Sequence, residues 1–391
     1  MGKKIAIIGA SYLQRPLVEK AKEMGIETHV FAWQDGNVVE DIADFYYPIS
    51  IIEKEIILDN CEKIGIDGII SIASDIAMTT VNFITEKLNL IGNSVESTII
   101  STNKYEMRKA LKCAGIPCPK FEVFGTPEFL DNSIFNFPVI VKPTDSSGSK
   151  GVTKVNNVAD VSLALKKAID NSSQKKAIVE EYIDNLAEYS VEFISFKAKH
   201  YFLAITEKVT TGPPYFVEKE HHQPADVSAV VKSKIIEVVI NSLNALGIEN
   251  GASHSEVCLT TKSEVRVIEI AGRMGGDLIG SDMVFHSTGF DFVKAVIQVA
   301  LNEFDAKTLN ELNNNYAGVY FVFPKAGRIM SINDNSKLFK YVKKTIAILN
   351  VGDNIETTID VSRKRAGVIL YCHPTRKLYI KPENVLKFEV E

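Results

Sequence analysis

The sequence contains few cysteines, and none of them are paired or clustered. Five cysteines are scattered over 391 residues, and no CxxC or Cys/His ligand spacing occurs. An odd, scattered set excludes a disulfide framework as the basis of the fold and does not indicate a zinc site. We therefore expect a reducing, cytoplasmic location.

Long apolar runs and an excess of positive charge are also missing. No segment approaches the roughly 18 apolar residues of a membrane-spanning helix, and the apolar run after Lys3-Lys4 is too short for a signal peptide. The net charge is −5 with mixed signs and no basic stripe. This argues against nucleic acid as the main partner, so we expect neither a membrane nor a nucleic acid.

Two common nucleotide-binding fingerprints are absent. The turn at Gly9-Ala10-Ser11 lacks GxGxxG, so NAD binding is not indicated. The Ser/Gly-rich segment at 146–151 lacks GxxxxGK[ST] and lies between two predicted strands, so it is not a P-loop.

The length and the order of the predicted elements indicate several domains. A chain of 391 residues is long for one core. The opening alternates strands and helices, including a short strand at Leu90-Ile91, which is typical of a parallel α/β unit. We predict an α/β and α+β protein with a Rossmann-like domain over 1–100, an α+β domain over 101–312 with a hairpin subdomain near 120–185, and a strand-rich domain over 313–391.

The segment VIEIAGRMGGD (267–277) contains the most informative pattern. An apolar strand carries Glu269 and is followed by Arg273 and the pair Gly275-Gly276, while a second carboxylate, Glu256, stands in SHSEVCL. Two carboxylates at strand level can hold Mg²⁺ together with substrate phosphates, and an arginine can bind a phosphoryl or carboxylate oxygen with two hydrogen bonds. The alternative is a strand edge with solvated charges.

A Ser/Gly-rich loop and two lysines form a candidate phosphate site. Small residues let backbone N–H groups approach an anion closely, and hydroxyl groups add donors. The alternatives are a flexible hairpin tip and two surface charges. The candidate residues are Lys104 at the start of a helix, Lys142 on the strand before the loop, and Ser147, Gly148, Ser149 and Gly151 in the loop.

A third segment suits the nucleoside part of a nucleotide. The run Glu180-Glu181-Tyr182-Ile183 offers backbone groups and an apolar wall to a purine edge, and Glu188 can accept hydrogen bonds from ribose hydroxyls. Taken alone, these acidic residues are solvated turn charges.

Together these motifs resemble the ATP-grasp superfamily from about Lys104 to Asp282. The resemblance rests on Lys104 with Arg108, IPCP, FPVIVKP, the Gly-rich hairpin, VEEYI, AEYSVE, GASHSE and VIEIAGRMGG. It implies that Lys104, Lys142 and the loop contact ATP phosphates, that residues 180–183 and Glu188 hold adenosine, and that Glu256 and Glu269 bind Mg²⁺ or Mn²⁺. Arg273 would bind the transferred phosphoryl group or the activated acid.

One position departs from the family pattern. Many members carry Asn two residues after the second glutamate, and here that residue is Ala271. This puts one metal ligand in doubt. The segments EIAGRMGGD and HSE are most similar to those of the amino-acid and peptide ligases, and the usual domain arrangement is similar to that of biotin carboxylase.

Several residues have weaker indications. His254 can orient the substrate or be a histidine satisfied within the strand, and Asp75 can face the site or cap a helix with Ser74. Residues 206–225 are predicted to form a loop that lines the second-substrate pocket. Arg365 is predicted to be a strand-edge charge, with an active-site role as the alternative.

The resemblance implies an enzyme that activates a carboxylate as an acyl phosphate and joins it to an amine, with small-molecule substrates and ADP and phosphate as products. Amino acids or peptides are the expected substrates. The alternatives are a bicarbonate-activating enzyme similar to carbamoyl-phosphate synthase or a purine-pathway carboxylase, and an inactive nucleotide-binding regulator. The family also suggests a homodimer.

Overall fold

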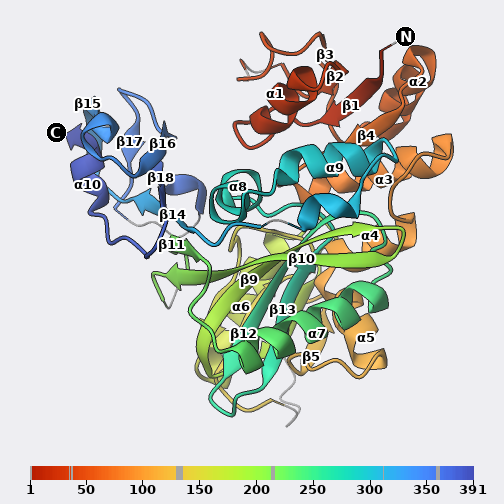
Figure 1. Cartoon of the computed structure of the whole chain (residues 1–391). Helices are drawn as coiled ribbons and strands as arrows, with labels where there is room; N and C mark the ends of the chain where they lie inside the picture. Colours follow the sequence, from red (N-terminus) through yellow and green to blue (C-terminus); the bar gives the residue numbers. More distant parts are fainter. Residues whose placement is uncertain are drawn as a thin grey trace.

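The structure is a computed structural model that describes residues 2–34, 36, 38–128, 135–212, 216–310, 312–357 and 362–391. The mixed α/β and α+β class predicted from the sequence is confirmed (Figure 1). Within the described residues, no helix is long and apolar enough to cross a membrane.

The first part of the chain is a parallel α/β layer. Its four-stranded sheet has the order β3-β2-β1-β4, and the central strand β1 is buried because its residues are almost all apolar. The predicted strand at Leu90-Ile91 is wrong, since α3 ends at a left-handed Asn89 and an irregular segment follows. The elements are β1 (Lys4–Ile8), β2 (Glu27–Phe31), β3 (Phe45–Tyr47), β4 (Gly68–Ile70), α1 (Arg15–Glu23), α2 (Lys54–Ile64), α3 (Asp75–Leu88) and α4 (Val95–Thr102).

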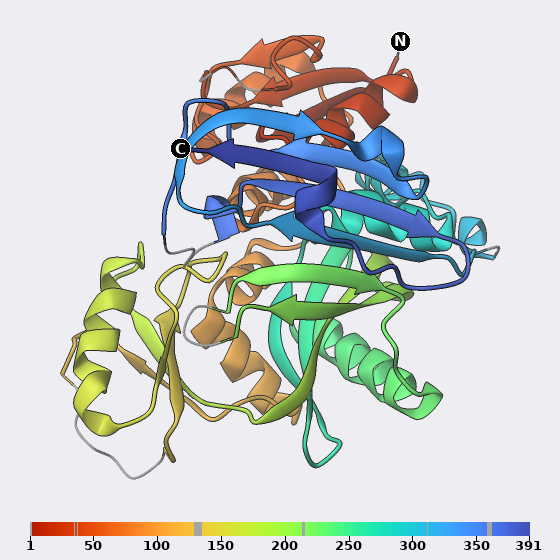
Figure 2. The same cartoon turned by 90° about the vertical axis from the view of Figure 1, so that its left-hand side faces the viewer.

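A small antiparallel subdomain follows and carries the Ser/Gly-rich loop. The predicted hairpin is confirmed, because β6 pairs with β7 on either side of that loop. In Figure 2 the subdomain, in yellow, lies beside the strands of the large sheet, in green. The sheet order is β5-β8-β6-β7. The elements are α5 (Lys104–Cys113), β5 (Phe121–Phe124), β6 (Val139–Pro143), β7 (Thr153–Val155), η1 (Val158–Asp160), α6 (Val161–Asp170) and β8 (Ala177–Glu181).

An eight-stranded sheet forms the centre of the molecule, in the order β13-β12-β9-β10-β11-β14-β18-β16. The predicted loop at 206–225 is largely wrong, because most of it belongs to β10 and β11; Pro213 and Pro214 lie outside the described residues. The first elements of this region are β9 (Asn185–Phe196), β10 (Lys199–Thr210), β11 (Glu218–Gln223), α7 (Ala229–Ala245), β12 (Gly251–Thr260), β13 (Val265–Ala271), η2 (Ile279–Met283), α8 (Val284–Thr288), α9 (Phe292–Ala300) and η3 (Ala306–Leu309).

The C-terminal part is rich in strands, as predicted, and shares the large sheet through the pairing of β11 with β14. The domain boundary near residue 312 stays a prediction, and a continuous sheet runs across it. A separate sheet has the order β17-β15-β19. The elements are β14 (Tyr316–Val322), β15 (Gly327–Asp334), η4 (Ser336–Leu338), β16 (Val342–Ala347), β17 (Asn354–Ile355), η5 (Ser362–Lys364), β18 (Gly367–His373), α10 (Pro382–Val385) and β19 (Leu386–Val390).

One apolar core joins the first domain to the large sheet. It contains residues of β1 and α1 together with Phe292 and Val296 of α9, and it reaches Ile194 of β9. Gly68 of β4 fits because a Cβ there would lie 2.8 Å from the carbonyl oxygen of Ala300. This packing sets the carboxyl ends of the parallel strands beside the end of β13.

Candidate functional site

A single cleft between the small subdomain and the large sheet brings together most of the predicted nucleotide site. Gly151 is buried and does not line the cleft. It packs against Pro143, since a Cβ at this position would lie 2.9 Å from Cγ of that proline. The predicted residues that line the cleft are Lys104, Lys142, Ser147, Gly148, Ser149, Glu180, Glu181, Tyr182, Ile183, Glu188, Glu256 and Glu269.

Lys104 links the loop to one of the predicted metal ligands. Asn103 caps the N-terminus of α5, so Lys104 is the first helical residue. Its Nζ donates to the carbonyl oxygen of Ser146 at 2.8 Å and to Oε1 of Glu269 at 3.0 Å. Burial disfavours the ammonium, but Glu269, Asp75 and Glu180 together raise the pKa of Lys104.

Lys142 belongs to a buried three-charge cluster. Glu180 accepts from Nε of Arg108 at 2.8 Å, and its second oxygen lies 2.7 Å from Nζ of Lys142. Burial alone would raise the pKa of Glu180, but Arg108 and Lys142 lower it to about 2. Burial, Arg108 and Lys104 lower the pKa of Lys142 despite Glu180. The sequence assigned backbone contacts to Glu180 and missed the role of its carboxylate in fixing Lys142.

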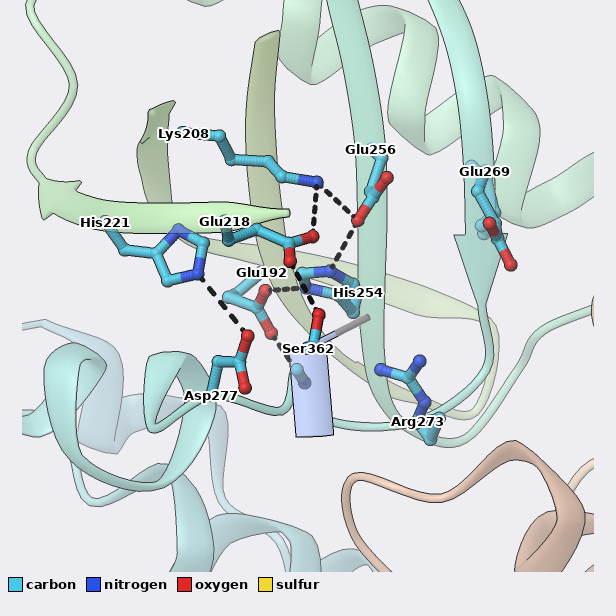
Figure 3. Close-up of polar contacts among 12 residues, drawn as sticks. Glu192, Lys208, Glu218, His221, His254, Glu256, Glu269, Arg273, Asp277 and Ser362 are labelled. Carbon is cyan, nitrogen blue, oxygen red and sulfur yellow. Dashed lines mark hydrogen bonds and ion pairs between the residues drawn. The ribbon is translucent and has the colours of Figure 1, made fainter. Parts of the chain in front are cut away.

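The two predicted metal ligands lie side by side. The strand register places Glu256 of β12 opposite Glu269 of β13, so both side chains lie on the same face. Glu256 also accepts from Nζ of Lys208 on β10 at 2.7 Å (Figure 3), a partner that sequence analysis missed. Burial would raise the pKa of Glu256, but Lys208 and His254 lower it well below its usual range.

This pair of carboxylates fits a divalent cation. Mg²⁺ is commonly held by one or two carboxylates together with substrate phosphates, and the cleft places both glutamates on the side that carries the two lysines. Among the described residues, no group of three or more His, Cys, Asp or Glu side chains is placed to hold a metal by itself. Ala271, in the position of the expected Asn, is buried and adds no oxygen ligand.

His254 is held between two carboxylates. Its Nδ1 forms a hydrogen bond with Glu192, and its Nε2 lies 3.6 Å from Oε1 of Glu256 (Figure 3). Burial would lower the pKa of His254, but Glu192 and Glu256 together raise it to about 9. Glu192 also accepts from the backbone N of Gly275 at 3.2 Å. It is the last residue of the motif AEYSVE, to which the sequence analysis assigned a role only at Glu188.

Arg273 and Asp75 meet across the boundary between the first domain and the large sheet. Nε and Nη2 of Arg273 donate to the two carboxylate oxygens of Asp75 at 2.8 and 3.0 Å. Asp75 begins α3 and Ser74 caps that helix, so the helix-cap alternative is confirmed at Ser74. An active-site role for Asp75 stays a prediction. Gly276 also faces the first domain, since a Cβ there would lie 3.8 Å from Cβ of Ala73.

A further charged cluster lies where the C-terminal part meets β11. Arg365 is buried, donates to both oxygens of Asp277, and lies over the ring of Phe321 at 3.6 Å. Nε2 of His221 is 3.7 Å from Oδ2 of Asp277. The prediction of a strand-edge charge at Arg365 is therefore wrong, because tertiary packing buries it. The active-site alternative named for Arg365 does not by itself predict its contact with Asp277, which depends on tertiary packing.

Comparison with known proteins agrees with this geometry. Residues 135–282 match the family model of the ATP-grasp domain, so the chain contains an ATP-grasp domain. The L-amino acid ligase from Bacillus licheniformis has the same fold, with a TM-score of 0.87 at 24% identity, over 100% of this chain and 99% of that one.

Two curated relatives are similar at low identity. Alanine–anticapsin ligase of Bacillus subtilis is 27% identical over 305 residues, which are 68% of this chain and 64% of that protein. Formate-dependent phosphoribosylglycinamide formyltransferase of Prochlorococcus marinus is 24% identical over 357 residues, which are 87% of this chain and 84% of that protein.

Proposed function

We propose that the protein is an ATP- and Mg²⁺-dependent ligase that joins a carboxylic acid to an amine through an acyl phosphate, with amino acids or short peptides as substrates. The observation that carries this proposal is the single cleft in which Lys104, Lys142, the loop at 146–149 and the pair Glu256–Glu269 converge. The similarity to alanine–anticapsin ligase supports the amino-acid substrate class.

The side chains suit the charge changes of this reaction. An oxygen of the acid attacks the γ-phosphorus of ATP, and ADP leaves with the bridging oxygen. The amine nitrogen then attacks the acyl carbon, phosphate leaves with the original carboxylate oxygen, and the nitrogen loses a proton. Fixed cations stabilise the negative charge on the transferred group without a protein nucleophile. Lys104 and Lys142 hold phosphates, and Arg273 orients the acid.

A bound Mg²⁺ would be held by Glu256 and Glu269, and it would neutralise phosphate charge. The loop at 146–149 closes one side of the cleft and limits the access of water to the acyl phosphate.

A second candidate is an enzyme that activates a very small acid. The similarity to the formate-dependent formyltransferase over 87% of the chain favours it. In either case we propose a cytoplasmic enzyme with small-molecule substrates, and a homodimer remains part of the proposal.

The test is a screen with Mg²⁺-ATP and pooled amino acids, formate and bicarbonate, with products analysed by mass spectrometry. We expect substrate-dependent ADP and phosphate, and a new mass equal to acid plus amine minus water. ADP that depends on formate or bicarbonate and not on amino acids would replace the main proposal with the second candidate. Tight ATP binding without any turnover would support an inactive regulator.

A further inference from the structure

Glu192 is a fully buried carboxylate beside the proposed site of acyl transfer. It lies on β9 with no exposed surface. It makes two hydrogen bonds, one with Nδ1 of His254 and one from the backbone N of Gly275 at 3.2 Å. A buried charge is costly unless it is paired, so both contacts are needed to keep this carboxylate in the sheet.

The sheet register explains why Glu192 meets His254. The two residues are direct partners across β9 and β12. Two residues further along β12 lies Glu256, which pairs with Ser190 of β9. Side chains of direct partners lie on the same face. With Nδ1 bonded to Glu192, the ring turns its Nε2 toward Glu256 and the side of the sheet that carries the proposed metal ligands (Figure 3).

Gly275 lets the loop after β13 approach the same carboxylate. A Cβ at this position would lie 2.7 Å from Nδ1 of His254 and 2.9 Å from Oε1 of Glu192. Only glycine fits without moving one of these groups. The peptide that follows Arg273 and Met274 is thereby tied to the carboxylate that orients His254.

We propose that Glu192 is a positioning residue that fixes the ring of His254 and the loop from Arg273 to Gly275 in one arrangement around the reacting acid. This inference rests on the proposed ligase function. Among the interactions of the described residues, Glu192 has no hydrogen bond or ion pair with Lys104, Lys142 or the loop at 146–149. Its loss should therefore lower kcat and leave the KM for ATP unchanged.

The test compares Glu192→Gln, His254→Asn and the double variant. Glu192→Gln should lower kcat roughly ten- to hundredfold, and the double variant should be no slower than the slower single variant, because the two residues act as one unit. The matched control is Ser255→Ala, which should leave kcat unchanged. Ser255 is buried next to His254, and its hydroxyl has no hydrogen-bond partner among the residues that the structure describes. Additive losses, or a KM for ATP that rises with the fall in kcat, would contradict the proposal.

A second pair of variants tests the contact of Glu192 with the loop that follows β13. Gly275→Ala should lower kcat because its methyl group displaces Glu192 or His254. Gly272→Ala, in the same loop, should not, since its nearest contacts are at 3.6 Å. Equal kcat values for these two variants would contradict the positioning role.

A spectroscopic readout separates this inference from the ligase proposal. The wild type should show a low-field NMR resonance from the Nδ1 proton of His254, and Glu192→Gln should lose it. A wild type without substrate-dependent ADP would overturn the ligase proposal, while this resonance would still decide whether Glu192 holds His254. Its persistence in Glu192→Gln would overturn the inference.

Discussion

Arg273 and Asp75 form a two-point ion pair between residues 198 positions apart in the chain, one at the end of β13 and one at the start of α3. Both side chains are mostly buried. Burial disfavours the charge of Asp75, but Arg273, with smaller contributions from Lys104 and His254, lowers the pKa of that carboxyl. The first domain therefore fixes the orientation of the arginine that we assign to the acid substrate.

Replacing Asp75 with Asn should lower kcat/KM for the acid substrate and leave the KM for ATP unchanged. The variant keeps the size of the side chain but loses the charge that holds the guanidinium. A hydrogen bond to a charged group contributes about 1.5–3 kcal/mol, so we expect a loss of kcat/KM for the acid on the order of tenfold or more. Steady-state kinetics with each substrate varied in turn would check this. An unchanged kcat/KM would contradict the coupling.

Lys142→Met should weaken ATP binding roughly ten- to hundredfold, because the cleft loses one charged donor to a phosphate. Glu180 keeps its bond to Arg108 in this variant, so the fold should survive. Calorimetric titration with ATP provides the measurement. Lys166→Met is the matched control, since Lys166 is an exposed lysine of the same subdomain that pairs with Asp170. If Lys142→Met bound ATP with wild-type affinity, the assignment of Lys142 to the phosphate site would be wrong.

Glu269→Gln should raise the Mg²⁺ concentration needed for half-maximal activity and lower kcat. The amide keeps an oxygen but loses the charge that attracts the cation. It also removes the ion pair that holds Lys104. A titration of activity against free Mg²⁺ at fixed ATP would measure both effects. Activity and Mg²⁺ dependence equal to those of the wild type would show that the metal assignment is wrong.

The Glu180 cluster should make the stability of the protein depend on acid pH. Arg108 and Lys142 lower the pKa of Glu180 from its usual 4.5 to about 2 in the folded state. The stabilisation is therefore complete above about pH 4.5 and is lost as the pH falls toward 2. Urea unfolding at several pH values should show a weaker pH dependence in Glu180→Gln over this range. If the free energy of unfolding depended equally on pH in the two proteins, the ion pairs of Glu180 would not contribute to stability as predicted.

The convergence of the candidate nucleotide-site residues in one cleft could be predicted because the parts of the site are contiguous in sequence. The strand with Lys142 and the loop at 146–149 belong to one hairpin, and the run 180–183 begins at the end of the neighbouring strand β8. The same holds for Glu256 and Glu269, whose strands are neighbours in the chain and pair directly.

The rest of the site depends on contacts that no local pattern encodes. Glu192 meets His254 only because β9 and β12, some sixty residues apart, share a register. Arg365 reaches Asp277 because the C-terminal strands extend the large sheet. The sequence of 206–225 predicts a loop because it combines Gly and Pro with polar residues, and these polar residues belong largely to the paired strands β10 and β11.

The most direct test of the acyl-phosphate mechanism follows an oxygen atom. The substrate acid is labelled with ¹⁸O in its carboxylate, and the products are separated and their masses are measured by mass spectrometry. The acyl-phosphate route predicts that one labelled oxygen from each activated acid appears in inorganic phosphate, with ADP as the nucleotide product. Label in AMP together with pyrophosphate would show that the enzyme adenylates its substrate, and would contradict the proposed mechanism.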